Sequence, residues 1–381
     1  MNNENFSVKR EQYVLSAIIE EHLATGEPVG SKSVSEHFTN AVGHGGGQNI
    51  GQNIGQHIGM SSATIRNVMS ELEDAGFLKH PHTSAGRVPT DAGYRFYVDN
   101  LLGILQISAE DLNYINEHLG ISTNDVALAT PERLFERTSQ LLSNLSKNVG
   151  IVVSPSLAEN RLQHIKFLNL ADKRILVIMV SEPNLVHHKV IQLEQTLTPE
   201  ELEKTANYLN AEFTGKSLSK IRSQILNLMH DEKMLFDKML QTAMILCSES
   251  LEDDSEAGGS VYVDGASNII SQPDFSNFTK LRELLRTFEE KSRLVQILNE
   301  CIRRDQSFRD RAAVIIGSEN LAPSLQNCAL ITAPYRLGKH TNAVGTLTVL
   351  GPTRIEYARM IAVVSYLAQL LETVLTAEKG N

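Results

Sequence analysis

The sequence predicts an α+β protein of several domains that begins with a winged helix-turn-helix. The chain has 381 residues, which suggests two or three domains rather than one core. A helical pattern at residues 61–75 leads directly into a basic hairpin pattern. Farther along, strand patterns give way to helical ones and then return, as an α+β domain with an inserted piece requires.

The helix expected at residues 61–75 has a clear start and a clear end. Ser61 suits an N-cap, because its hydroxyl can accept from a free amide of the first turn, and Gly76 suits the position after a helix end. Apolar residues recur at i, i+3, i+4 and i+7 and predict one buried stripe: Ile65, Val68, Met69 and Leu72.

The opposite face of this helix is small, polar and positive. It carries Ala63, Asn67 and Ser70, flanked by Thr64 and Arg66, and its first half has no acidic residue. These properties suit a helix that enters the major groove of DNA.

Residues 77–89 predict two short strands around a turn. Lys79 and His80 follow the first strand, small residues fill positions 83–86, and Arg87 begins the second strand. A helix followed by a basic hairpin indicates a winged helix-turn-helix. The alternative is an ordinary amphipathic surface helix with a hairpin.

Two earlier helices would complete a three-helix core. The first is expected at residues 8–25, where an apolar stripe ends at the turn 26–30. The second is short, with Ser33 and Glu36 spaced as a capping box and with Val34 and Phe38 on one face.

Residues 43–59 separate the second and third helices with a low-complexity tract in which Gln-x-Ile-Gly recurs. The tract lacks the spacing of a phosphate-binding loop, so it is expected to be a flexible surface insertion. Four histidines lie in the tract or on the hairpin, and no metal site is expected from them: His44, His57, His80 and His82.

The rest of the chain is expected to form one interrupted α+β domain. Thr90 or Asp91 caps a helix that leads out of the first domain, and residues 106–130 predict a linker with one weak helix. A helix follows at residues 131–145. Strands are expected at residues 149–153, 162–170, 175–180, 186–193, 261–263, 313–316, 329–332 and 344–350.

Helical patterns fill most of residues 197–303 and close the chain. Capping boxes at Thr198 and Glu201 and at Thr353 and Glu356 mark two helix starts. The long helical pattern at residues 221–246 has more methionine and leucine than a small core needs, which favours self-association. The alternative is that these residues form only the core of the inserted piece.

Composition excludes several classes of function. The net charge of -10 argues against indiscriminate nucleic-acid binding, although a local positive face remains compatible with it. No run approaches the roughly 20 apolar residues of a membrane span, and the N-terminus lacks a signal-peptide pattern, so a cytoplasmic protein without membrane contact is expected. The three cysteines, Cys247, Cys301 and Cys328, are expected to be inert thiols. No catalytic constellation is apparent, so an enzyme is not expected.

Four stretches resemble the bacterial heat-inducible transcription repressors of the HrcA type. They are TGEPVGSKSVSE at 25–36, SSATIRNVMSELEDAGFL at 61–78, HPHTSAGRVPTDAGYRFYVD at 80–99 and GPTRIEYARMI at 351–361. The resemblance implies a winged-helix domain at 1–105, a GAF-like domain at 106–196 and 304–381, and a dimerising domain inserted at 197–303. This sequence departs from the family pattern at residues 43–59, where the family has a turn of a few residues.

The resemblance also implies a function. Such a chain would be a homodimer that represses chaperone operons by binding an inverted-repeat operator on double-stranded DNA. It would lose activity on heat shock and be kept active by the chaperonin. The DNA-binding residues implied for the recognition helix and wing are Ser61, Ser62, Thr64, Arg66, Asn67, Ser70, His82, Thr83, Ser84, Gly86 and Arg87. No cofactor is expected. The alternative is a winged-helix regulator that senses a small molecule through its GAF-like domain.

Overall fold

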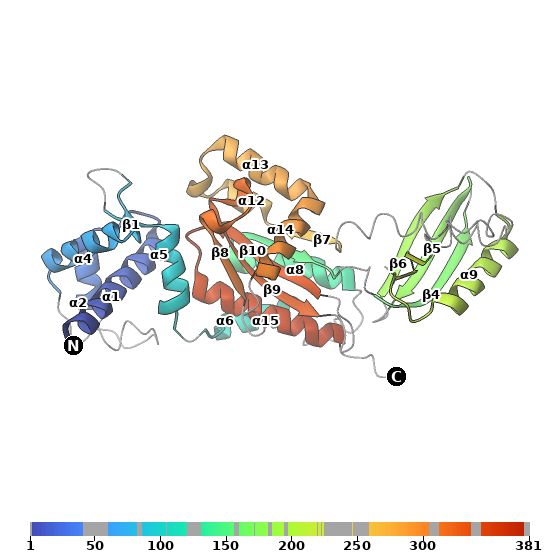
Figure 1. Cartoon of the computed structure of the whole chain (residues 1–381), viewed down its shortest axis with the longest axis horizontal. Coiled ribbons are helices and arrows are strands. Elements are labelled where there is room, and N and C mark those ends of the chain that lie inside the picture. Colours follow the sequence, from blue (N-terminus) through green and yellow to red (C-terminus); the bar gives the residue numbers. More distant parts are fainter. Residues whose placement is uncertain are drawn as a thin grey trace.

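The structure is a computed structural model. It describes residues 2–40, 60–81, 86–103, 105–119, 131–155, 160–170, 172–181, 185–193, 197–218, 220–221, 223–224, 246, 259–304, 312–336 and 344–376. The fold is α+β, with helices and several antiparallel sheets. Figure 1 shows three bodies in a row: a helical head that contains the N-terminus, a central body built on a sheet, and a smaller unit of strands and one helix at the far end.

The head consists of three helices and a two-stranded antiparallel sheet. The helices are α1 (Asn2–Thr25), α2 (Ser31–Asn40) and α4 (Ser62–Asp74), and the strands are β1 (Leu78–Lys79) and β2 (Val88–Pro89). Their apolar sides share one core that includes Leu15, Ile18, Ile19, Val34, Ile65, Val68, Met69 and Leu72. The predicted stripe of the third helix is therefore confirmed.

The caps of α4 are also as predicted, whereas the start of α2 is not. The Ser61 hydroxyl accepts from the amide of Thr64 at 3.2 Å, and Gly76 adopts a φ of +82° just after the helix. Helix α2 begins at Ser31, so Ser33 lies inside the helix and donates to Glu21 of α1 instead of capping. The low-complexity tract at 43–59 lies outside the described residues.

Helix α5 (Asp91–Phe96) leaves the head and continues as a π-helical turn, Tyr97–Leu101. Thr90 is its N-cap, because its hydroxyl accepts from the amide of Gly93 at 3.1 Å. The expected linker that follows contains a packed helix, α6 (Ala109–Leu119), with Ile115 and Leu119 buried. The one helix expected in this segment is therefore present, but it is packed against the protein rather than weak, and residues 120–130 lie outside the described residues.

The central body is built on a five-stranded antiparallel sheet in the order β7-β3-β10-β9-β8. The strands are β3 (Val149–Val153), β7 (Val261–Asp264), β8 (Ala313–Ile316), β9 (Cys328–Arg336) and β10 (Val344–Pro352). Strand β8 forms one edge and β7 the other. The segments that meet in this sheet are therefore far apart in the sequence.

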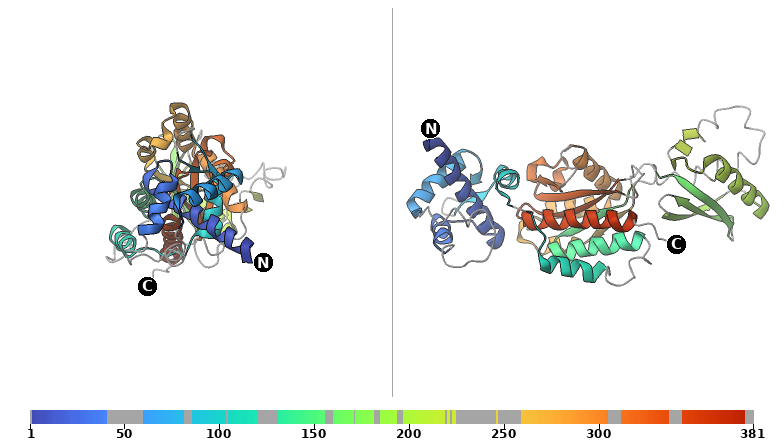
Figure 2. Two further views of the ribbon diagram at one scale, coloured as in Figure 1. Left: turned by 90° about the vertical axis from the view of Figure 1, so that its left-hand side faces the viewer. Right: turned by 90° about the horizontal axis from the view of Figure 1, so that it is seen from below.

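Helices cover both faces of the central sheet. Helices α6, α8 (Pro131–Ser146) and α15 (Tyr357–Thr376) lie on one face, as the view from below in Figure 2 shows. Helices α12 (Ala266–Ile270), α13 (Phe278–Glu289) and α14 (Lys291–Arg304) lie on the other. Short 3-10 turns occur at Pro273–Phe275, Gly317–Glu319 and Pro323–Leu325.

Helix α15 corrects two expectations. It begins at Tyr357, so Thr353 and Glu356 do not form a capping box, and the Thr353 carbonyl accepts instead from the Tyr357 hydroxyl. By length and composition α15 is apolar enough to cross a membrane, which the expectation of no such segment missed. In this fold Ile361, Val364 and Leu367 are buried in the central core.

The smaller unit consists of a three-stranded antiparallel sheet and helix α9 (Pro199–Phe213). Its strands are β4 (Leu162–Asn169), β5 (Arg174–Ser181) and β6 (Leu185–Gln192), with β5 in the middle. One face of the sheet packs on α9 through a core of its own. The predicted capping box of Thr198 and Glu201 is present at the start of α9.

The arrangement of the sheets moves the expected domain boundaries. Residues 162–193 were assigned to the same domain as 149–153, but β4 to β6 form the separate unit. Residues 261–303 were assigned to the insertion, but β7 pairs with β3 and α13 and α14 pack on the central sheet. The unit inserted between β3 and β7 includes the described residues within 160–246, and most of the long helix expected at 221–246 lies outside them.

Candidate nucleic-acid interface

The outer face of α4 presents three polar side chains from the predicted set. Arg66, Asn67 and Ser70 are exposed, and in the part of the chain that the structure describes none of them forms a hydrogen bond or ion pair. The helix is held from behind, where Ile65, Val68, Met69 and Leu72 are buried. The face therefore combines a rigid backbone with side chains that are available to an external partner.

The predicted residues at the start of α4 have structural roles. The Ser61 and Thr64 hydroxyls lie 3.0 Å apart at the cap, and the Ser62 hydroxyl lies 3.0 Å from that of Ser31. Ser31 starts α2, so this contact brings two helix starts together. Neither helix has an acidic residue in its first turn. Both starts thus favour anions, because free amides and the helix dipole give them positive potential.

Ser31 was missed at the sequence level. Its signal was its position directly after Gly30 in the turn that precedes α2. That turn also binds the hairpin of β1 and β2, which we call the wing, because Val29 and Arg87 exchange backbone hydrogen bonds of 2.8 and 2.9 Å. A Cβ on Gly86 would lie 2.4 Å from the Val29 carbonyl oxygen, so only glycine allows this approach.

The wing is tied to α4 by the carboxylate of Glu73. One oxygen of Glu73 lies 2.7 Å from Nη2 of Arg87, and the other lies 2.7 Å from Nδ1 of His80. The Arg87 side chain is only 17% exposed. Arg87, which was expected to contact DNA, is therefore paired inside the head. Glu73 had no local signal, because it meets the two wing residues only when the hairpin folds back.

His82, Thr83 and Ser84, the remaining predicted wing residues, lie outside the described residues.

Elsewhere, burial raises the pKa of the Cys328 thiol to about 12, which keeps it protonated and unreactive. The described residues contain no cluster of three or more His, Cys, Asp or Glu side chains placed to hold a metal ion.

Comparisons with known proteins agree with the resemblance seen in the motifs. The family model described as "HrcA protein C terminal domain" matches residues 132–361. The heat-inducible transcription repressor HrcA of Geobacter sulfurreducens is 37% identical over 97% of this chain and 98% of its own length. The chain belongs to the HrcA family.

Other HrcA relatives extend over the same length. The HrcA repressor of Syntrophobacter fumaroxidans is 35% identical over 96% of this chain and 97% of its own. A crystal structure titled as that of a hypothetical protein has the same fold, with a TM-score of 0.58, 22% identity and coverage of 97% of this chain and 98% of that one. The HrcA relatives are named as transcription repressors, not as enzymes.

Proposed function

We propose that this chain is a transcription repressor whose N-terminal head is a winged helix-turn-helix and whose central body is a GAF-like domain. In this proposal it binds an inverted-repeat operator on double-stranded DNA upstream of chaperone operons, in the cytoplasm. The observation that carries the proposal is the outer face of α4, where exposed polar side chains stand on a helix anchored by four buried apolar residues. That is the construction a recognition helix needs.

The roles of the head residues follow from their positions. Arg66, Asn67 and Ser70 read base edges, because arginine and asparagine can each form paired hydrogen bonds with a purine. The adjoining starts of α2 and α4 at Ser31 and Ser62 contact phosphate. Residues 82–84 also contact the DNA in this proposal, while Arg87 positions the wing through Glu73.

Asn67→Ala tests the reading of bases. The variant is expected to lose about tenfold in affinity for the operator and little on random DNA, because a paired contact to one base is worth about 1 to 3 kcal/mol of discrimination. Titration of operator and scrambled duplexes at one salt concentration measures the ratio of the two affinities. Asn100→Ala, an exposed asparagine beyond α5, is the matched control. Equal losses on both duplexes for Asn67→Ala would refute the assignment.

Two copies of the chain form the repressor in this proposal, because an inverted repeat needs two heads related by a two-fold axis. The inserted unit offers the surface. The face of its sheet that points away from α9 is apolar along the middle strand β5, and Val186 and Val190 of β6 are 54% and 51% exposed. We call this the open face, and its apolar residues are Leu168, Leu176, Ile178, Val180, Val186 and Val190.

A second copy is the occupant that the proposal assigns to the open face. Exposed apolar patches of this kind mark interaction surfaces, and isologous pairing covers both copies at once. The chaperonin is the second protein partner, which keeps the repressor folded. Heat lowers the folded population, since a typical stability of about 5 to 15 kcal/mol makes that population sensitive to temperature.

A further inference from the structure

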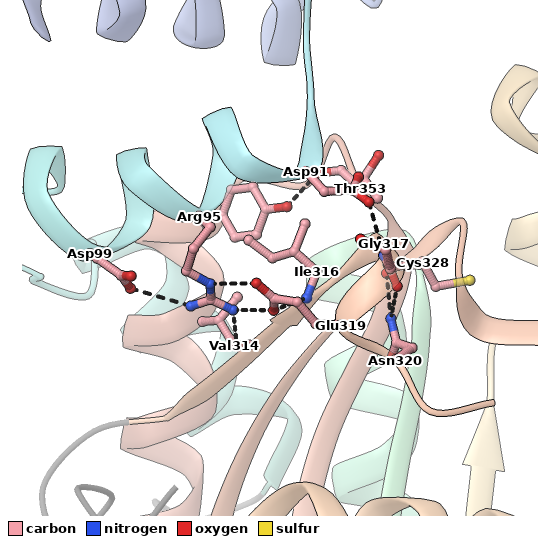
Figure 3. A network of polar contacts seen from close by, with 12 residues as sticks. Asp91, Arg95, Asp99, Val314, Ile316, Gly317, Glu319, Asn320, Cys328 and Thr353 are labelled. Carbon is pink, nitrogen blue, oxygen red and sulfur yellow. Dashed lines mark hydrogen bonds and ion pairs between the residues drawn. The ribbon is translucent and has the colours of Figure 1, made fainter. Parts of the chain in front are cut away.

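The head meets the central body through apolar packing, in which Tyr94 of α5 lies against Tyr357, and through charged contacts at the edge of the central sheet. Figure 3 shows α5 of the head lying against strand β8 and the turn Gly317–Glu319 that follows it. Strand β8 has a neighbour only on one side in the five-stranded sheet. The contact therefore joins the last helix of the head to an edge of the body.

Arg95 makes the first of the charged contacts. Its Nε donates to one oxygen of Glu319 at 2.8 Å and its Nη2 donates to the other at 2.5 Å. The same Nη2 donates to the Val314 carbonyl at 2.5 Å. Glu319 in turn accepts from the amide of Ile316 at 2.8 Å. A two-bond arginine–carboxylate pair restricts direction as well as distance, so it resists rotation of the helix.

Asp91 makes the second contact, one helical turn earlier. Its carboxylate accepts from the amide of Ser318 at 2.9 Å. Gly317 has a φ of +52°, and a Cβ there would lie 2.2 Å from the Asp91 carboxylate oxygen. The turn must therefore carry glycine at this position for the helix to approach. Two contacts at separate points fix an orientation that one contact would leave free.

Helix α5 is equally tied to the wing. The Thr90 hydroxyl donates to the Gly76 carbonyl at 2.6 Å, and the rings of Phe77 and Phe96 lie 5.2 Å apart. A Cβ on Gly93 would lie 2.3 Å from the Phe77 carbonyl oxygen, so helix and wing are in close contact. A rotation of α5 relative to the body would therefore carry the wing and α4 with it.

We propose that Asp91, Arg95 and Glu319 form an orientation clamp that sets the half-site spacing the dimer can read. The proposal rests on the proposed function, namely binding of two heads to an inverted repeat. Heads held rigidly on a dimer match one separation of half-sites. Heads that swivel accept several separations, but they bind the correct one more weakly because both must be ordered on the DNA.

The test compares three variants, Arg95→Gln, Glu319→Gln and the double variant, on three duplexes. The duplexes carry the operator, the operator lengthened by about two base pairs between its half-sites, and a single half-site. Each single variant is expected to bind the operator about tenfold more weakly and to lose most of its preference over the lengthened duplex, with half-site binding within about twofold.

The double variant separates a clamp from two independent effects. The double variant is expected to bind the operator as tightly as either single variant, because both single substitutions break the same Arg95–Glu319 pair. Arg286→Gln, which breaks the exposed Arg286–Glu290 pair on α13, is the matched control and should behave as the unchanged protein. If Arg95→Gln does not fold, Glu319→Gln carries the test, because its amide oxygen can still accept from Ile316.

The outcomes distinguish failure of the clamp from failure of the proposed function. Unchanged spacing preference in the variants, with normal half-site binding, overturns the clamp and leaves the proposed function intact. Additive losses in the double variant also overturn it. A scrambled duplex is titrated alongside, and failure of the unchanged protein to prefer the operator over it overturns the proposed function itself.

Discussion

Individual side chains in the head have the roles that their surroundings allow. Asn67 and Arg66 are available to a partner because the stripe behind them is buried and no neighbour among the described residues pairs with them. Arg87 carries the same kind of charge as Arg66, but Glu73 holds it at 2.7 Å. Residue type alone would predict that both arginines contact DNA. The ion pair with Glu73 instead gives Arg87 a role inside the head and leaves Arg66 as the arginine available to DNA.

Tyr94 provides a test of stability at the residue scale. It is 2% exposed, its ring lies 5.7 Å from that of Tyr357, and its hydroxyl finds no hydrogen-bond partner among the described residues. Burial is the main cause that raises its pKa above the ordinary value. Tyr94→Phe should therefore leave the free energy of unfolding unchanged or raise it by up to about 1 kcal/mol, because an unpaired polar group is removed from the interior.

Denaturant unfolding of Tyr94→Phe and Tyr357→Phe measures this difference. The Tyr357 hydroxyl donates to the Thr353 carbonyl at 2.5 Å, so its loss should cost about 1 kcal/mol. Equal destabilisation by the two substitutions would show that the Tyr94 hydroxyl has a partner after all.

At the scale of single elements, local signals predicted much of the fold. The caps of α4, α5 and α9 depend on neighbours within a few residues, so the pattern contained them. Sheet membership depends on pairing between distant segments, so strands β4 to β6 could not be distinguished from β3 by their sequences. The apolar stripe of α4 is a local pattern, so it predicted the exposed face of this helix. Glu73 and Ser31 were missed because their partners are distant in the sequence or meet them only in the folded head.

Helix α6 shows how a polar segment becomes part of the core region. Asp111 is 4% exposed and accepts from Nη2 and Nε of Arg359 in α15 at 2.8 and 3.0 Å. These hydrogen bonds from Arg359 are the main cause that lowers the pKa of Asp111 below its ordinary value of 3.8. The pair therefore stabilises the folded protein at neutral pH.

Asp111→Asn is expected to lower the free energy of unfolding by about 1 to 2 kcal/mol at pH 7, a value kept modest because Arg359 is partly exposed. A lowered folded-state pKa means that the stabilisation is complete above 3.8 and is lost as the pH falls through the lower folded value. The difference in free energy of unfolding between Asp111→Asn and the unchanged protein should therefore narrow as the pH falls through the folded-state pKa of Asp111.

Urea unfolding at a series of pH values measures this effect. Glu356→Gln, which removes an exposed partner of the same arginine, is the control and should change little. A gap between Asp111→Asn and the unchanged protein that stayed constant down to strongly acidic pH would contradict an ionised Asp111 as its cause.

At the scale of the whole molecule, each of the three bodies has a separate role in the proposed function. The head presents α4, the central body carries the head on the edge strand β8, and the inserted unit lies at the opposite end (Figure 1). Val186 and Val190 on the open face of that unit are exposed. Such an arrangement places the proposed pairing surface far from the proposed DNA-binding surface. Pairing and DNA binding can then be altered separately.

The mass of the protein–operator complex tests the central claim most directly, because it asks whether two heads act together on one inverted repeat. Sedimentation should give two chains per operator duplex for the unchanged protein. Ile178→Lys places a charge in the middle of the open face and should give one chain per duplex at the same concentration. Ile270→Lys, at a 57% exposed isoleucine of α12, should still give two. One chain per duplex for the unchanged protein, or two for Ile178→Lys with undiminished stability, would contradict the account.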